Sequence, residues 1–130
     1  MVIDSSAIVA ALLQERDAGR IAAAIERAEQ RLLSAANLLE ASIVIERRRG
    51  EEGGLELDLL LYRTEIEIVP VDQDQVEIAR VAWRRFGKGR HPAALNYGDC
   101  FAYALAKSRA LPLLFVGDDF SRTDIDRVPL

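Results

Sequence analysis

The chain has 130 residues and a net charge of −4; half of the residues are apolar and 29% are charged. This composition predicts a single globular domain over residues 1–130 and excludes disordered and fibrous chains. No apolar run is long enough to cross a bilayer and no leader-type segment is present, so we expect a cytoplasmic protein with no membrane partner. The negative charge argues against nonspecific coating of nucleic acid but is compatible with a nucleic-acid enzyme.

Short apolar runs alternate with helix-length segments along the chain. The runs predict buried strands at 1–3, 31–33, 66–71 and 113–116. Apolar residues spaced three and four apart predict helices over 5–14, 19–29, 35–49, 55–64, 73–86 and 98–109. This alternation favours an α/β fold, with a mainly parallel sheet covered by helices on both faces. Glutamates alternate with isoleucines in the third strand, which we therefore expect near an edge.

Aspartates follow the first and the last predicted strand. Asp4 ends the first, and Asp118 follows the last after a glycine that lets the backbone turn. Ligands bind beyond the carboxyl ends of parallel strands, so both acids are candidates for one site. Each also has a local explanation: Asp4 can cap the helix that begins at Ser5, and Asp118, beside Asp119, can be a turn acid.

Two further candidate acids lie on predicted helices. Asp99 is the third residue of a helix that Asn96 would cap, so a capping box explains it as well as a metal site does. Glu40 lies in the middle of an apolar helix, where neither a cap nor a turn explains an acid. Its alternative role is to extend into solvent or to form an ion pair with Arg47 or Arg48.

Several carboxylates in one crevice would repel one another unless cations neutralise them. Oxygen ligands without histidine or cysteine suit Mg²⁺, with Mn²⁺ as a substitute, and argue against zinc. Such an ion can hold a phosphodiester, lower the pKa of a bound water and stabilise the leaving oxygen. The residues therefore predict metal-dependent phosphodiester hydrolysis with four catalytic metal ligands, Asp4, Glu40, Asp99 and Asp118.

At these acids the sequence resembles the PIN-domain ribonucleases, and more narrowly the VapC toxins of bacterial type II toxin–antitoxin pairs. The matching segments follow the family's order over nearly the whole chain: "VIDSSAIVAALL", "SAANLLEASIVI", "LNYGDCFAYALAK" and "LLFVGDDFSRTDI". The resemblance implies a PIN-like three-layer α/β/α sandwich and an Mg²⁺-dependent endoribonuclease. In it, Asp4 and Asp99 correspond to the main magnesium ligands. Glu40 and Asp118 correspond to the other two acids, with Asp119 in reserve for Asp118.

The same resemblance implies a substrate and protein partners. Members of the family cleave structured RNA, often transfer RNA, and are covered by a VapB-type antitoxin encoded beside the toxin gene. It also implies a homodimer. Ser6 stands in the family's small-hydroxyl position, where it would hold a water or a phosphate oxygen.

The segment "RRFGKGRH" is a candidate RNA-contacting rim, because an acidic site needs a cationic surround to hold an anionic polymer. Its cations are Arg84, Arg85, Lys88 and Arg90. A solvated helix end and loop explains any one of these side chains equally well.

Two other functions are compatible with an α/β chain of this length. A receiver-like signalling domain would accept phosphate on an aspartate, but it requires an acid after a middle strand and a lysine after a later one. The regions around Leu33 and Val71 lack that pair. A catalytically silent PIN domain would serve only as a binding module, and the complete set of acids weighs against it.

Overall fold

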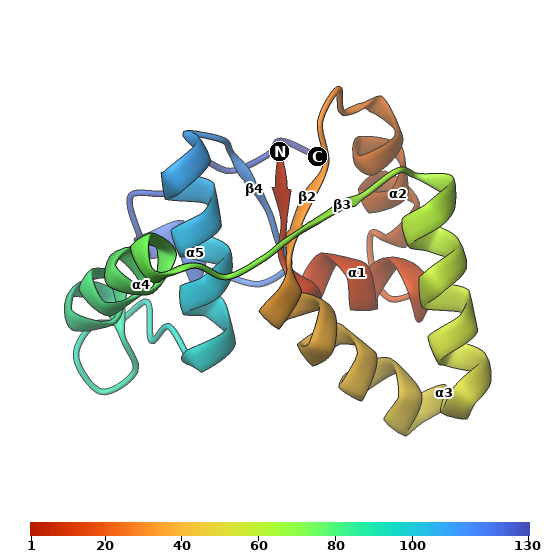
Figure 1. The fold of residues 1–130 in the computed structure, drawn as a ribbon, viewed down its shortest axis with the longest axis horizontal. Coiled ribbons are helices and arrows are strands. Elements are labelled where there is room, and N and C mark those ends of the chain that lie inside the picture. Colours follow the sequence, from red (N-terminus) through yellow and green to blue (C-terminus); the bar gives the residue numbers. More distant parts are fainter.

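A parallel four-stranded sheet forms the centre of the computed structural model, which describes residues 1–130 (Figure 1). The strand order is β3-β2-β1-β4, and each neighbouring pair runs parallel. The strands are β1 (Val2–Ile3), β2 (Leu32–Ser34), β3 (Glu67–Val69) and β4 (Leu113–Leu114). The expected parallel sheet is confirmed, and the third strand lies at an edge as its alternating glutamates indicated.

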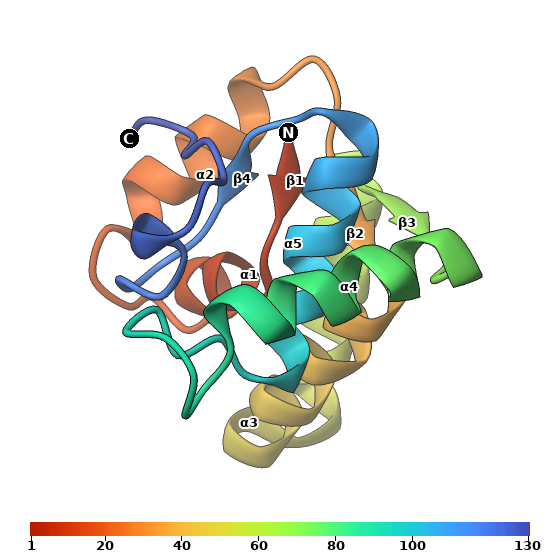
Figure 2. The same ribbon diagram turned by 90° about the vertical axis from the view of Figure 1, so that its left-hand side faces the viewer.

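Helices cover both faces of this sheet (Figures 1 and 2). They are α1 (Ser5–Leu12), α2 (Ala18–Arg27), α3 (Ala35–Arg63), α4 (Gln73–Phe86) and α5 (Tyr97–Arg109), followed by a short 3₁₀ turn at Phe120–Arg122. The first three pack on one face, and α4 and α5 pack on the other. This arrangement confirms the three-layer α/β/α fold class. No helix combines the length and apolar character needed to cross a lipid bilayer.

Alternate strand residues supply two separate cores, because successive side chains of a strand point to opposite faces. Val2 and Leu32 are buried with the residues of α4 and α5. Ile3 and Leu33 are buried with those of α1, α2 and α3. Burying one such aliphatic side chain contributes about 1.5–3 kcal/mol, so both helical layers are anchored to the short strands.

Most predicted boundaries lie within two residues of the observed ones, and two of the differences have a structural reason. The helices predicted at 35–49 and 55–64 form one element, α3, which is kinked at Gly50, where φ is +63°. The last strand stops at Leu114 instead of continuing to Val116, because the Val116 N–H donates to the Ser6 hydroxyl at 3.0 Å. That side-chain bond takes Val116 out of the sheet ladder and begins a loop.

Candidate active site

Asp4 lies directly after β1 and is 3% exposed. Its Oδ2 accepts a hydrogen bond from the Ser6 N–H at 3.0 Å, so it caps α1 as the local interpretation predicted. Its Oδ1 is also buried and has no hydrogen-bond partner. An unpaired buried carboxylate oxygen is costly, so the cap accounts for only half of this side chain.

Glu40 points inward from α3 and takes part in no salt bridge, which removes the alternative of an arginine partner. Its Oε1 accepts hydrogen bonds from the Ser5 hydroxyl and from Asn37 Nδ2, the latter at 3.2 Å. The same Asn37 amide donates to the Gly98 carbonyl of α5 at 3.0 Å. The fully buried Asn37 therefore joins α3 to the start of α5 and orients Glu40.

The first turn of α5 lies against the Glu40 carboxylate. A Cβ atom built on Gly98 would lie 2.0 Å from Glu40 Oε2, so a larger residue at this position would displace the Glu40 carboxylate. The positive end of a helix favours a nearby carboxylate. Sequence reasoning missed Ser5, Asn37 and Gly98 as parts of the site. The detectable signal was a glycine in the first turn of a helix beside a candidate acid.

Asp99 is 9% exposed and forms the expected capping box with Asn96. The Asp99 N–H donates to Asn96 Oδ1 at 2.9 Å, and the Asn96 N–H donates to Asp99 Oδ2 at 3.0 Å. As with Asp4, the cap fixes the orientation of the carboxylate through one oxygen. Each aspartate thus keeps a second oxygen that the cap does not use.

The buried carboxylates act on one another. Burial raises the pKa of Asp4 to about 6. Hydrogen bonds from Ser6 oppose this rise, and the charge of Glu40 adds to it. Burial also raises the pKa of Asp99, to about 7, although a hydrogen bond from Asn96 lowers it. The charges of Asp4, Asp119 and Glu40 add to the rise. Acids that follow β1, lie on α3 and begin α5 therefore share one electrostatic environment.

The loop after β4, residues 116–124, carries two exposed acids, Asp118 and Asp119, and we call it the acid loop. Gly117 precedes them with φ +96°, a conformation that glycine adopts without strain and that lets the chain turn. Asp119 contributes to the raised pKa of Asp99, whereas Asp118 is not among the groups that affect Asp4 or Asp99. Asp119 is therefore within electrostatic reach of Asp99.

This donor set fits a hard divalent cation, because it is made of carboxylate oxygens and includes the unpaired Oδ1 of Asp4. Mutual repulsion of the kind that raises the pKa of Asp99 is relieved by a bound cation. The carboxylates do not lie at the spacing of a metal-bound site, since no group of three or more Asp, Glu, His or Cys side chains is close enough together to hold an ion.

Three of the four predicted rim cations lie together. Arg84, Lys88 and Arg90 line a groove of about 790 Å³ between α4 and α5. This groove also includes Asn96 and Tyr97 at the start of α5, close to Asp99. The fourth cation, Arg85, is absent from the groove lining and instead pairs with Asp124.

The predicted small-hydroxyl residue, Ser6, lies beside Asp4. Its N–H donates to the Asp4 carboxylate, and its hydroxyl accepts from the Val116 N–H. Ser6 therefore connects the first acid to the beginning of the acid loop.

Comparison with known proteins identifies the family. Residues 1–126 match the family model of the PIN domain. The chain is 56% identical to ribonuclease VapC30 of Mycobacterium tuberculosis over 130 residues, which cover 100% of this chain and 99% of the relative. It is 55% identical to ribonuclease VapC of Mycolicibacterium smegmatis over 128 residues, 98% of this chain and 99% of the relative.

Solved structures agree in fold. VapC20 of Mycobacterium tuberculosis, described as a sarcin-ricin loop cleaving toxin, aligns with a TM-score of 0.79 at 17% identity over 99% of this chain and 98% of the other. VapBC2 of Rickettsia felis, bound to a DNA fragment from its promoter, aligns with a TM-score of 0.74 at 15% identity over 98% and 96% of the two chains. The family match rules out the receiver-like alternative. This chain therefore belongs to the PIN-domain family and, within it, to the VapC ribonuclease toxins of toxin–antitoxin systems.

Proposed function

We propose that the chain is an Mg²⁺-dependent endoribonuclease that hydrolyses phosphodiester bonds of structured RNA. The observation that carries the proposal is the electrostatic coupling of three acids from separate elements, with an unpaired buried oxygen on Asp4. Cores rarely keep such a group without a functional reason, and strongly perturbed carboxyl groups are typical of functional sites.

Asp4 and Asp99 are the proposed principal ligands of Mg²⁺, with Mn²⁺ as a substitute. Their caps use one oxygen each, Asp4 Oδ2 and Asp99 Oδ2, and leave the other oxygen for a cation. When bound, Mg²⁺ supplies the positive charge that lowers the pKa of a water and stabilises the leaving oxygen of the phosphodiester. The capped carboxylates are preoriented, so cation binding requires little rearrangement of the backbone.

Glu40 is the proposed third acid. Ser5 and Asn37 both donate to its Oε1, which fixes the carboxylate and leaves Oε2 without these bonds. Oε2 is therefore the oxygen we assign to the cation or to the proton of the attacking water. Carboxylates that must accept a proton need this kind of fixed geometry.

The fourth acid comes from the acid loop. The resemblance of the sequence to the family assigns Asp118, and the charge effect on Asp99 supports Asp119. We propose Asp119 as the acid that acts at the site, with Asp118 as its neighbour on the solvent side. Comparison of D118N with D119N separates the two assignments, because only loss of the acting acid should weaken Mg²⁺ binding.

The RNA backbone is proposed to follow the basic groove beside α5. Arg84, Lys88 and Arg90 supply positive charge there, and Ser6 lies at the metal end, where it can donate to a phosphate oxygen. Arg85 is a weaker candidate for an RNA contact, because its guanidinium lies 3.6 Å from the Asp124 carboxylate. In this arrangement the basic side chains lie beside the acidic site and form no ion pairs with its carboxylates.

A VapB-type antitoxin is the proposed protein partner, and the cytoplasm, where the RNA substrate is found, is the proposed location. A solved structure of the same fold, described as a toxin–antitoxin complex from Klebsiella pneumoniae, supports an antitoxin partner. A homodimer is proposed as well. Leu39, Leu55 and Tyr62 expose 62%, 68% and 82% of their surface on α3, and these side chains, which do not line the basic groove, offer an apolar contact area. Light scattering of the purified chain, with and without the product of the neighbouring small gene, tests both.

RNA cleavage by purified protein tests the proposed activity. Transfer RNA is the first substrate, and a sarcin-ricin loop fragment is the comparison, because the VapC20 description names that RNA. We expect discrete cuts with MgCl₂, none with EDTA, and at least about 100-fold slower cutting by D4N. Cutting that persists in EDTA, or that D4N leaves unchanged, would refute the proposal. Such cutting would come from a contaminating nuclease, and this chain would then be a silent binding module.

A further inference from the structure

The acid loop is fixed firmly at its beginning. The Val116 N–H is held by the Ser6 hydroxyl at 3.0 Å, which ties the loop to the start of α1. Phe120, which directly follows the two loop acids, is 2% exposed and packs on Phe115 with ring centroids 5.1 Å apart. The two acids themselves make no hydrogen bond through their side chains, so their position depends on how the loop is held at both ends.

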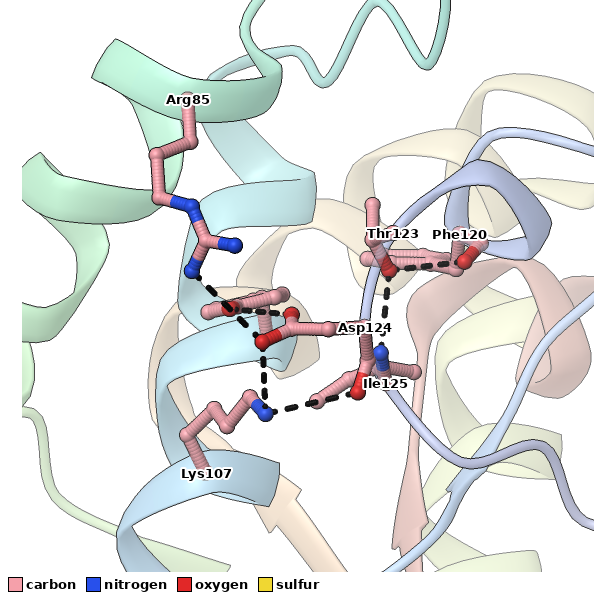
Figure 3. A network of polar contacts seen from close by, with 7 residues as sticks. Arg85, Lys107, Phe120, Thr123, Asp124 and Ile125 are labelled. Atoms are coloured by element: carbon pink, nitrogen blue, oxygen red, sulfur yellow. Dashed lines mark hydrogen bonds and ion pairs between the residues drawn. The ribbon is translucent and has the colours of Figure 1, made fainter.

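The end of the loop is held by Asp124, at the centre of a polar network (Figure 3). The Tyr103 hydroxyl donates to Asp124 Oδ1 at 2.6 Å. Lys107 Nζ lies 3.0 Å from Asp124 Oδ2, and Arg85 Nη1 lies 3.6 Å from the same oxygen. One carboxylate thus joins the acid loop to both α4 and α5.

The anchoring residues share a helix face with a proposed metal ligand. Tyr103 and Lys107 follow Asp99 by four and eight residues in α5, so the three side chains form one stripe. The stripe carries Asp99 at its first turn and the contacts to Asp124 further along. The separation between Asp99 and the loop acids therefore depends on how Asp124 docks on this stripe.

The Tyr103 hydroxyl and the Asp124 carboxylate keep their protonation states near neutral pH. Tyr103 is 3% exposed, and burial, together with the hydrogen bond and charge of Asp124, raises the pKa of its hydroxyl. Partial burial acts to raise the pKa of Asp124, but hydrogen bonds from Tyr103 and Lys107 outweigh it and hold that pKa below its usual value. A phenol that stays protonated therefore donates to a carboxylate that stays ionised across neutral pH.

We propose that Tyr103 and Asp124 are positioning residues that hold the loop acid Asp119 beside Asp99. The inference rests on the proposed function, because it concerns the geometry of the proposed metal site. Both residues act through Asp119 and not by contact with the cation or the RNA. Loss of the contact frees the end of the acid loop and weakens the contribution of Asp119, while the capping box keeps Asp99 in place.

A double-mutant cycle on Mg²⁺ binding, measured by titration calorimetry of the full chain, tests this role. Y103F removes one hydroxyl and keeps the buried ring. We expect it to weaken Mg²⁺ binding about threefold to tenfold in the wild-type background and to have no effect in the D119N background, since coupled residues are not additive. D124A should behave like Y103F, and D124N, which keeps an acceptor for the phenol, should recover part of the loss.

E77Q is the control for the Asp124 variants, because it breaks another exposed ion pair, with Arg80 on α4 at 3.0 Å. We expect it to leave Mg²⁺ binding unchanged. The inference would be overturned if Y103F weakened Mg²⁺ binding equally with and without Asp119. It would also be overturned if Y103F lowered the melting temperature but left Mg²⁺ binding unchanged, or if D119N left Mg²⁺ binding intact. Failure of the proposed function is a separate result, namely Mg²⁺ binding that survives D99N.

Discussion

The two carboxylate oxygens of Asp4 have different environments, which explains why the local sequence was compatible with both a helix cap and a metal ligand. Oδ2 caps α1 through the Ser6 N–H, whereas Oδ1 is buried without a partner. Local sequence identifies a cap, but it does not say how many oxygens the cap uses. Asp99 repeats the pattern in its capping box. Glu40 was the more informative residue, because no backbone rule explained it and the structure directs it inward.

Gly98 is the residue whose replacement tests the close fit between α3 and α5. In G98A the new Cβ would meet Glu40 Oε2, which is the end of a flexible side chain and can move aside. We therefore expect RNA cleavage to fall about 10- to 100-fold, because a displaced catalytic group is poorly oriented. The stability cost should stay below about 1.5 kcal/mol, measured by urea unfolding.

The matched control for this substitution is G19A, since nothing lies within 4 Å of a Cβ at that position of α2. Alanine in place of glycine in a helix should add about 0.5–1 kcal/mol of stability and leave cleavage unchanged. Cleavage by G98A at the wild-type rate would contradict the assigned position of Glu40.

The raised pKa values of Asp4, about 6, and Asp99, about 7, predict how stability depends on pH. Both groups hold a proton in the folded chain at pH values where the unfolded chain has lost it, so folding takes up protons in this window. The free energy of unfolding, measured in EDTA, should therefore fall as the pH rises from 5 to 7. D99N should show a shallower fall.

Addition of Mg²⁺ should oppose this fall, because the cation binds the deprotonated carboxylates and stabilises only the folded chain. Urea unfolding at several pH values, with EDTA or with MgCl₂, measures both effects. A flat profile in EDTA, or a D99N profile as steep as that of the wild type, would show that these carboxyl groups are not perturbed in the folded state.

Among the elements, α3 differs most from its prediction. Apolar spacing predicted two helices, over 35–49 and 55–64, yet helical structure resumes directly after the kink at Gly50. The returning half packs against the first, and a Cβ on Gly53 would lie 2.8 Å from Ile45 Cγ2. This packing overrides the poor helix propensity of glycine, which a reading of local sequence cannot foresee. Element order and most other boundaries followed from apolar periodicity alone.

The kink itself predicts the effect of G50A. Gly50 has φ +63° and ψ −158°, a region that only glycine enters readily, so alanine should cost about 1–3 kcal/mol. Urea unfolding measures this loss. RNA cleavage by the folded fraction should be unchanged, since Gly50 lies outside the candidate site. A stability equal to that of the wild type would mean that α3 can straighten or bend elsewhere.

For the whole molecule, topology explains why most of the site was predictable. Parallel strands end at one edge of the sheet, so residues that follow β1 and begin α3 and α5 meet there without any knowledge of side-chain packing. The loop acid was not predictable in the same way. Asp118 and Asp119 are adjacent in sequence, so apolar periodicity does not distinguish them, and only Asp119 is among the charges that raise the pKa of Asp99. Supporting contacts such as Asn37 likewise depend on tertiary packing.

Binding of Mg²⁺ by this carboxylate site is tested most directly by titration calorimetry of the wild type and of D4N at pH 8. Asn keeps the size of the side chain and an oxygen that can cap α1, so circular dichroism should show an unchanged fold. We expect the wild type to bind Mg²⁺ and D4N to bind it at least about 10-fold more weakly, because a carboxylate ligand is lost. Equal affinities of the two proteins, or a wild type that does not bind Mg²⁺, would contradict this expectation.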